Sequence, residues 1–380
     1  MRQSTRGQVA PFIVMDVMEA ARQAEAAGRH IIRMEVGQPS TPAPAAARAA
    51  LAAALDQPLG YTVALGLPAL REAIAGLYLR WYGVDLDPAR VVITPGSSGA
   101  FLLAFAALFD AGDRVAVGEP GYPSYRQILR AMSVEPVGMQ TSANNRYQPV
   151  PEDIPEDVQG VMLASPGNPS GTMLGRDALT ALAERTRQIG AALISDEIYH
   201  GLSYGERCVS ALEVTDDVVV INSFSKYFSM TGWRIGWMVV PPDMVRTMDR
   251  LAANMFICPP HASQLAALAA LSPEGEAEAE GNLAVYAENR RLMLERLPAM
   301  GFTRIAPPDG AFYVYADVSD LTDDSAALAR EILGQAGVAV TPGIDFDPVR
   351  GARTLRFSYA QSTADIAEGL DRLARWMAAR

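Results

Sequence analysis

The sequence predicts an α/β protein, with a large and mainly parallel sheet flanked by helices and a smaller α+β domain beside it. Between about residues 90 and 240, short β-branched runs alternate with helical patterns, as βαβ crossovers require. Beyond residue 275 the alternation gives way to shorter strands mixed with helices. A chain of 380 residues is also too long for a single domain with one simple core, and its length fits two domains.

The elements of the large domain are predicted from apolar runs bounded by polar turns. Its strands are expected at Val91–Ile93, Arg114–Val117, Val158–Leu163, Ala191–Ile194, Val218–Asn222 and Ile235–Val240. Its helices are expected at Ser97–Phe109, Ser124–Met132 and Asp177–Ile189. In a parallel sheet of this kind, ligands bind beyond the carboxyl ends of the strands.

Elements are also predicted on both sides of this region, and together they indicate three parts of the chain. Alanine-rich Ala43–Leu55 predicts a helix because alanine has the highest helix propensity, and Ser272 precedes a long helix through Leu297. The C-terminal segment is expected to hold strands Ala311–Tyr315, Val338–Val340 and Leu355–Ser358 and helices Ser325–Gln335 and Ala364–Met377. We expect an N-terminal arm with part of the small domain at 1–42, the large domain at 43–275 and the small domain at 276–380.

Composition excludes several classes of function. A net charge of −11 disfavours nucleic acid and anionic membrane surfaces as partners. Cys208 and Cys258 lack CxxC spacing and the three histidines are scattered, so no metal site is expected. No apolar run follows the N-terminal residues, and Ala100–Phe109 has roughly half the length that spans a bilayer. We therefore expect a cytoplasmic protein.

Lys226 is the only lysine in a chain that carries 31 arginines. This bias indicates that ordinary surface cations are arginine in this chain, so a position that retains lysine needs more than charge. Only lysine offers an amine that can lose its proton and form a Schiff base with a carbonyl. The residue follows a β-like run in the polar segment Ser223–Arg234, where a chance surface lysine is the simpler alternative.

A second feature suits an anion. Gly96-Ser97-Ser98-Gly99 joins a strand to an apolar helix, where free N–H groups, hydroxyls and the helix dipole favour phosphate. Serine is also a routine helix cap, so this signal alone is weak. Arg234 is a candidate countercharge and Ser223 a further donor.

Two more polar groups follow predicted strands. Asp196 ends a buried strand and needs a cationic partner such as a protonated pyridine nitrogen, although helix capping is an equal alternative. Tyr199 lies three residues further on. Asn168 stands between two prolines in a loop after another strand, where its amide can donate to an oxygen.

Together these groups describe a site for pyridoxal 5′-phosphate. They offer an amine for its aldehyde, a loop for its phosphate, a carboxylate for its ring nitrogen and hydrogen-bond donors for its ring hydroxyl. The chain resembles the class I/II aminotransferases, which have the pyridoxal-phosphate fold type I with a seven-stranded sheet. The resemblance rests on Ser-x-Ser-Lys with Met-Thr-Gly-Trp-Arg-Ile-Gly-Trp at 223–237, on Asn-Pro-Ser-Gly at 168–171 and on Asp-Glu-Ile-Tyr at 196–199. It extends from about residue 10 to the C-terminus.

The resemblance implies a role for each of these positions. Lys226 would hold the cofactor as a Schiff base and, once displaced, move the proton from the substrate Cα. Asp196 would keep the pyridine nitrogen protonated, while Asn168 and Tyr199 would bond the ring hydroxyl. Tyr122 would stack on the ring, although a turn-packing tyrosine is the alternative. The phosphate would lie among Gly96, Ser97, Ser98, Ser223, Ser225 and Arg234.

The resemblance also implies a substrate site and a dimer. Arg356 matches the arginine that binds the substrate α-carboxylate, a task that suits its bidentate fork. Gly37 matches a glycine whose backbone closes over the same carboxylate, beside Asn168. Tyr61 matches a tyrosine that reaches the phosphate of the neighbouring subunit, so an obligate homodimer with shared sites is expected.

One departure from the family bears on the amino donor. Some relatives that use aspartate carry a lysine in the phosphate loop, where this chain has Ser98. The segment Met255–Pro259, which helps line the neighbouring site in relatives, is apolar. Both features favour a neutral donor, although an arginine from elsewhere could still bind a distal carboxylate.

The predicted activity is transfer of an amino group between an L-amino acid and a 2-oxo acid by a ping-pong mechanism. The main alternative is β-elimination on the same fold, as in a C–S lyase, because the motifs are shared. An effector-binding domain of a pyridoxal-phosphate-sensing regulator is the alternative from another class. It is disfavoured because the family match beginning near residue 10 leaves no room for a DNA-binding domain.

Overall fold

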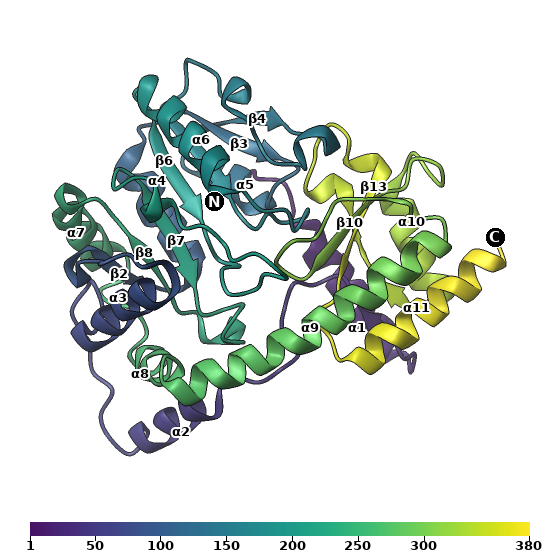
Figure 1. Cartoon of the computed structure of the whole chain (residues 1–380), viewed down its shortest axis with the longest axis horizontal. Helices are drawn as coiled ribbons and strands as arrows, with labels where there is room; N and C mark the ends of the chain where they lie inside the picture. The colour runs from purple at the N-terminus through teal and green to yellow at the C-terminus, as the bar shows by residue number, and fades with distance from the viewer.

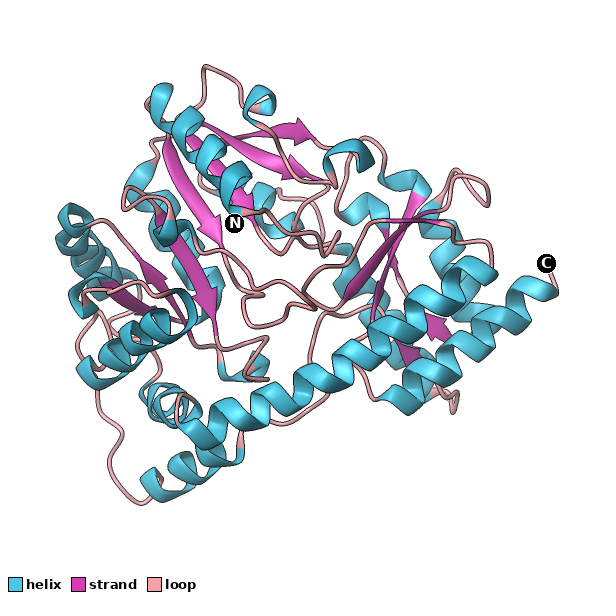
Figure 2. Cartoon of the chain, viewed as in Figure 1, coloured by secondary structure: helices cyan, strands magenta, loops and turns pink.

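The computed structural model describes all 380 residues and shows two lobes, each built on its own sheet (Figure 1). The larger lobe holds a seven-stranded sheet between helices, and the smaller holds a four-stranded sheet with helices on one side. The long helix α9 (Pro273–Ala299) runs from one lobe to the other along one side of the molecule. Figure 2 shows the loops of both lobes meeting between the two sheets.

The large sheet confirms the predicted α/β class. Its strand order is β2-β8-β7-β6-β5-β3-β4, and all neighbouring pairs are parallel except those made by β8. The strands are β2 (Val91–Thr94), β3 (Arg114–Glu119), β4 (Glu135–Gln140), β5 (Gly160–Ala164), β6 (Ala192–Asp196), β7 (Val219–Ser223) and β8 (Gly236–Val239). The sequence analysis placed six of these strands and missed β4, whose polar ends and proline and glycine obscure the apolar pattern.

The direction of β8 has a local cause. A parallel neighbour requires a crossover on one face of the sheet, usually through a helix. Residues 224–235 between β7 and β8 contain only one 3-10 turn, Thr231–Trp233, so the chain turns back and β8 pairs antiparallel with β7. The connecting loop therefore stays at the carboxyl end of β7, and it carries Lys226 and Arg234.

The helices of the large lobe cover both faces of its sheet (Figure 1). They are α2 (Ala45–Ala54), α3 (Pro68–Tyr82), α4 (Gly96–Leu108), α5 (Pro123–Ala131), α6 (Arg176–Gln188), α7 (Val245–Met255) and α8 (His261–Ala270). Helix α4 is apolar around its circumference because it packs against β7, β8, α5 and α7. No helix of the chain is both long enough and apolar enough to cross a membrane.

The small lobe combines the two ends of the chain. Its antiparallel sheet has the order β12 (Thr341–Pro342), β13 (Thr354–Ser358), β10 (Tyr313–Asp317) and β9 (Arg304–Ile305). N-terminal β1 (Ile32–Arg33) pairs in parallel with β11 (Val338–Ala339). The helices are α1 (Ile13–Ala26), α10 (Ser325–Glu331) and α11 (Thr363–Ala378). The predicted domain boundary at residue 275 falls within the first turn of α9.

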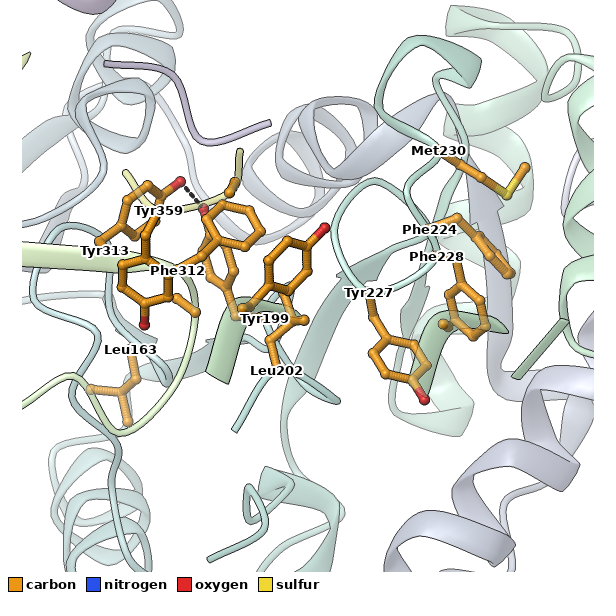
Figure 3. Packing of buried hydrophobic residues seen from close by; sticks show 14 of the residues in the cluster. Leu163, Tyr199, Leu202, Phe224, Tyr227, Phe228, Met230, Phe312, Tyr313 and Tyr359 are labelled. Atoms are coloured by element: carbon orange, nitrogen blue, oxygen red, sulfur yellow. Dashed lines mark hydrogen bonds between the residues drawn. The ribbon is translucent and has the colours of Figure 1, made fainter. Parts of the chain in front are cut away.

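Buried aromatic side chains fill the space where the lobes meet. Figure 3 shows Tyr199, Phe312, Tyr313 and Tyr359 gathered on one side, and Phe224, Tyr227 and Phe228 on the other. All seven are at most 6% exposed, and they belong to one continuous apolar cluster that includes both sheets. The two lobes therefore share a core, and the polar groups between them pack against closely packed apolar side chains.

Helix α1 is held at its beginning by a distant carboxylate. The N-cap residue Phe12 supplies no side-chain acceptor, and Asp345 instead accepts the N–H groups of Ile13 (3.2 Å) and Val14 (3.0 Å). These two groups have no partner within the helix, and a negative charge at this end also favours the helix dipole.

We predict that Asp345→Ala lowers the free energy of unfolding by about 1 kcal/mol, the usual contribution of a helix cap. Amide hydrogen exchange at Ile13 and Val14 should rise in this variant, because both N–H groups lose their acceptor. Asp345→Asn keeps an acceptor oxygen and should preserve most of the protection. Equal exchange at both amides in wild type and Asp345→Ala would contradict this account of the cap.

Candidate active site

A cavity of about 550 Å³ opens where the carboxyl ends of the large-lobe strands face the small lobe. Loops after β2, β3, β5, β6 and β7 reach it, as expected for a sheet of this topology. The cavity brings together most of the predicted site residues, namely Gly37, Ser97, Ser98, Tyr122, Asn168, Asp196, Tyr199, Ser225, Lys226, Arg234 and Arg356.

Lys226 lies between the lobes and reaches from the β7–β8 loop to the N-terminal segment. Its Nζ donates to the carbonyl oxygen of Gly37 at 2.6 Å. Burial lowers the pKa of Lys226 to about 7, with smaller contributions from the charges of Arg356 and Arg234 and an opposing one from Asp196. The amine is therefore partly neutral at physiological pH and able to act as a nucleophile or base.

Asp196 ends β6 and is 4% exposed. One carboxylate oxygen, Oδ1, accepts the N–H of Ile198 at 3.0 Å, and Oδ2 accepts the hydroxyl of Tyr125. Burial raises the pKa of Asp196 to about 6, while the hydrogen bond from Tyr125 acts in the opposite direction. A buried carboxylate with so few donors favours a cationic partner in the cavity.

Asn168 and Tyr199 approach the cavity from the loops after β5 and β6. The Oδ1 atom of Asn168 accepts from Nη1 of Arg356 at 2.8 Å, so its amide nitrogen remains able to donate elsewhere. The hydroxyl of Tyr199 lies 2.7 Å from that of Tyr313. Tyr313 lines the cavity, and the sequence analysis did not single it out.

The other end of the cavity is an anion-binding corner. Ser97 and Ser98 occupy the first turn of α4, where backbone N–H groups and the helix dipole favour negative charge. Gly96 has φ of +71°, and a Cβ there would lie 2.5 Å from Nη2 of Arg234. Glycine is thus required for Arg234 to lie over the start of the helix.

Two predicted phosphate residues, and one predicted for a neighbouring subunit, do not line the cavity. Ser223 lies behind Ser225, with its hydroxyl 2.8 Å from that of Ser225 and donating to the carbonyl of Ile235 at 3.0 Å. Gly96 lies beneath Arg234. Tyr61 stands on a loop before α3 with 83% of its surface exposed, and it does not line this chain's own cavity.

Arg356 is held rigidly in β13 of the small lobe. Its guanidinium lies 4.3 Å from the ring centre of Tyr313 and 4.6 Å from that of Phe346, close enough for cation–π attraction. Nη2 donates to the carbonyl of Glu35 at 2.5 Å, and Nη1 donates to Asn168. The Nε–H is buried without a partner, and Nη1 has a second N–H that remains available for a carboxylate.

The cavity wall includes residues that the sequence analysis missed. Phe12, Val14 and Met15 come from the beginning of α1, and Val36 and Ile198 from the loops. Phe12 packs edge-on against Tyr122, with ring centres 5.7 Å apart. No motif marks α1, because its contribution depends on the N-terminal segment folding back onto the small lobe.

These groups fit one cofactor chemistry. The buried carboxylate of Asp196 suits a pyridinium nitrogen, the corner beneath Arg234 suits a phosphate, and a partly neutral amine between them suits an aldehyde. The fold and site therefore define a pyridoxal-phosphate-dependent enzyme of fold type I.

Comparison with known proteins identifies the family. The model of the family described as aminotransferase class I and II matches residues 29–373. A valine–pyruvate aminotransferase from Mycobacterium tuberculosis is 49% identical over 99% of this chain and 98% of its own length. The chain therefore belongs to the class I and II aminotransferases, and it is a pyridoxal-phosphate-dependent aminotransferase.

Solved structures agree over the whole chain. One from Silicibacter pomeroyi is 67% identical with a TM-score of 0.96, covering 100% of both chains. An aspartate aminotransferase from Thermus thermophilus is 32% identical with a TM-score of 0.93, covering 99% of this chain and 100% of that one. These relatives confirm the predicted fold and the predicted reaction class.

The low pKa of Lys226 can be measured directly because the chain has no other lysine. In cofactor-free protein, the rate at which a small acylating reagent modifies Lys226 should rise with pH around a midpoint near 7, since only the neutral amine reacts. Mass spectrometry of the Lys226 peptide follows the reaction, and the N-terminal amine serves as an internal control. Asp196→Asn should shift the midpoint lower, whereas a wild-type midpoint near 10 would contradict the prediction.

Proposed function

We propose that this aminotransferase moves the amino group of a neutral L-amino acid to a 2-oxo acid. The observation that carries the choice of donor is the composition of the cavity. Its only cations are Lys226, Arg234 and Arg356, and each has a task that any amino-acid substrate requires. The side-chain region is bordered by Phe12, Met15 and Val36, which favour an apolar group.

The proposed cofactor contacts use the groups already described. Lys226 would bind the aldehyde as a Schiff base, and Asp196 would pair with the pyridine nitrogen. Ser97, Ser98, Ser225 and Arg234 would hold the phosphate, with Gly96 and Ser223 supporting them from behind. Asn168 and Tyr199 would donate to the ring hydroxyl, and Tyr122 would stack on the ring.

The proposed mechanism assigns two tasks to the chain's own residues. Pyridoxal phosphate supplies an electron-accepting ring that stabilises negative charge at the substrate Cα. Arg356, with Asn168 and the backbone of Gly37, would orient the substrate through its α-carboxylate. Lys226 Nζ would then accept the Cα proton, for which a pKa of about 7 is well matched to neutral pH.

The relatives support a neutral donor. The relative from Mycobacterium tuberculosis is a valine–pyruvate aminotransferase, and neither valine nor pyruvate has a charged side chain. The Thermus thermophilus aspartate aminotransferase is less similar, at 32% identity. In this chain Ser98 stands where some aspartate-using relatives have a lysine, and no second lysine replaces it.

We further propose a cytoplasmic homodimer with shared active sites. Tyr61 is supported as an interface residue by its exposure and by exposed apolar neighbours. Val63 is 59% exposed and Ile257 54%, which is costly for side chains facing water. A second copy of the chain would cover these groups and bring Tyr61 to the partner's phosphate.

The first test follows single half-reactions. The purified yellow protein should lose its near-visible absorbance when mixed with valine, leucine, alanine or methionine, and much less with aspartate or glutamate. Lys226→Arg should fold normally but lose both the absorbance and turnover, since a guanidinium cannot bind the aldehyde. Turnover in that variant would overturn the role of Lys226, and a preference for aspartate would overturn the proposed donor. Pyruvate and ammonia released from cysteine conjugates without a 2-oxo acid would instead indicate β-elimination.

The second test concerns shared sites. Tyr61→Ala and Lys226→Arg should each lower activity strongly in pure form. A mixed dimer of the two carries both defects in one site and none in the other, so it should recover about half of the wild-type activity if each site draws on both chains. Native mass spectrometry quantifies the mixed species. No recovery in confirmed mixed dimers would contradict the shared site.

A further inference from the structure

The side chains of the turn after β6 face either the cavity or the protein interior. Asp196 and Tyr199 line the cavity, whereas Glu197 and His200 point into the protein and are 1% and 2% exposed. Tyr199 appears in Figure 3 within the buried aromatic cluster. Neither Glu197 nor His200 lines the cavity, so the mechanism gives them no task.

The hydrogen bonds of His200 fix its protonation. Its Nε2 lies 3.0 Å from the carbonyl oxygen of Ser165, which can only accept, so Nε2 must carry the hydrogen. Its Nδ1 lies 2.6 Å from the hydroxyl of Tyr82 at the end of α3. Burial lowers the pKa of His200 to about 3, so the ring is neutral and Nδ1 accepts from Tyr82.

Glu197 is a second buried titratable group that faces His200, and burial raises the pKa of its carboxyl to about 8. Its Oε2 lies 3.4 Å from Nδ1. It accepts the N–H of Ala211 at 2.7 Å and the hydroxyl of Ser210 at 2.9 Å. These bonds fasten the 196–200 turn to the segment that follows it.

Ser165 connects His200 to the site. Its N–H donates to the carbonyl of Asp196 at 3.2 Å, and its own carbonyl accepts from His200, so both backbone groups are bound to the 196–200 turn. Three residues later the same loop carries Asn168, whose Oδ1 accepts from Arg356. A continuous series of hydrogen bonds thus runs from Tyr82 through His200 to the loop that carries Asn168.

We propose that His200 is a positioning residue, which with Tyr82 fixes the spacing between Asn168 and Tyr199 and, through Asn168, the orientation of Arg356. This inference rests on the proposed function, in which Asn168 and Tyr199 donate to the ring hydroxyl of the cofactor. Small displacements matter at such a site, because hydrogen bonds weaken steeply with distance and angle.

Four variants of the full-length enzyme test this role. Tyr82→Phe removes only the hydroxyl that binds Nδ1, and His200→Leu removes both bonds. His200→Gln keeps a donor for Ser165 and should rescue the site. Tyr78→Phe is the matched control: Tyr78 lies one turn earlier on α3, is buried, and accepts from Trp237 Nε1 at 3.3 Å, away from the cavity.

The readouts are the dissociation constant for pyridoxal phosphate, measured by equilibrium dialysis, and the KM and kcat for the best amino donor. We expect the dissociation constant to rise about fivefold in Tyr82→Phe and roughly 25-fold in His200→Leu, because the effects of losing one and then a second buried hydrogen bond multiply. KM should rise more than kcat falls, because Arg356 is affected through Asn168. His200→Gln should stay within about twofold of wild type.

A merely structural role would give a different pattern. All variants, including Tyr78→Phe, would melt at lower temperature, but cofactor affinity and KM would match those of the control, and this result would overturn the proposal. Asn168→Ala, measured in parallel, separates the two levels of inference. If Asn168→Ala binds pyridoxal phosphate as tightly as wild type does, the proposed role of Asn168 is overturned as well. If Asn168→Ala binds the cofactor weakly but His200→Leu binds it as tightly as wild type does, only the role of His200 is overturned.

Discussion

Lys226 and Asp196 are opposite charges at one edge of one sheet, and the cavity depends on their shared burial. Burial disfavours the charged form of each, raising the pKa of Asp196 and lowering that of Lys226. Their mutual attraction opposes both shifts. β6 and β7 are neighbouring parallel strands, paired from Ile194 and Val219 onward, so the sheet places Asp196 beside the end of β7, from which the loop with Lys226 begins. The loop that carries the lysine has no crossover helix, so the chain turns back into β8 and the lysine stays at the carboxyl end of β7.

The small lobe completes the site through a few contacts that cross between lobes. The N–H of Gly121 donates to the carbonyl of Phe346 at 3.0 Å, and Arg126 donates to the carbonyls of Asp345 and Phe346. Phe346 in turn packs against the guanidinium of Arg356. The loop after β3, which carries Tyr122, is therefore joined to the loop beside Arg356. The ends of the cavity that we propose for the cofactor and for the substrate thus share one set of supports.

Sequence patterns predicted those parts of the molecule that depend on local chemistry. Strand-ending polar residues such as Asp196 and Asn168 could be placed at one edge because parallel strands align their carboxyl ends. The walls made by Phe12 and Met15 could not, since they depend on Asp345 holding α1 from more than 300 residues away. Tyr125 and Tyr313 were missed for a similar reason. Each looks like an ordinary core aromatic until its hydroxyl meets Asp196 or Tyr199.

The three cations of the cavity differ in the property that each task needs. Two of them are arginines, whose planar guanidinium suits phosphate and carboxylate, whereas the amine of Lys226, with a pKa of about 7, changes its charge near neutral pH. The charge of Arg356 is itself one cause of that low pKa. A substrate carboxylate on Arg356 would offset this charge and raise the pKa of the nearby amine. Binding of a correct substrate would thus strengthen the proposed base, a response that an arginine in its place would not permit.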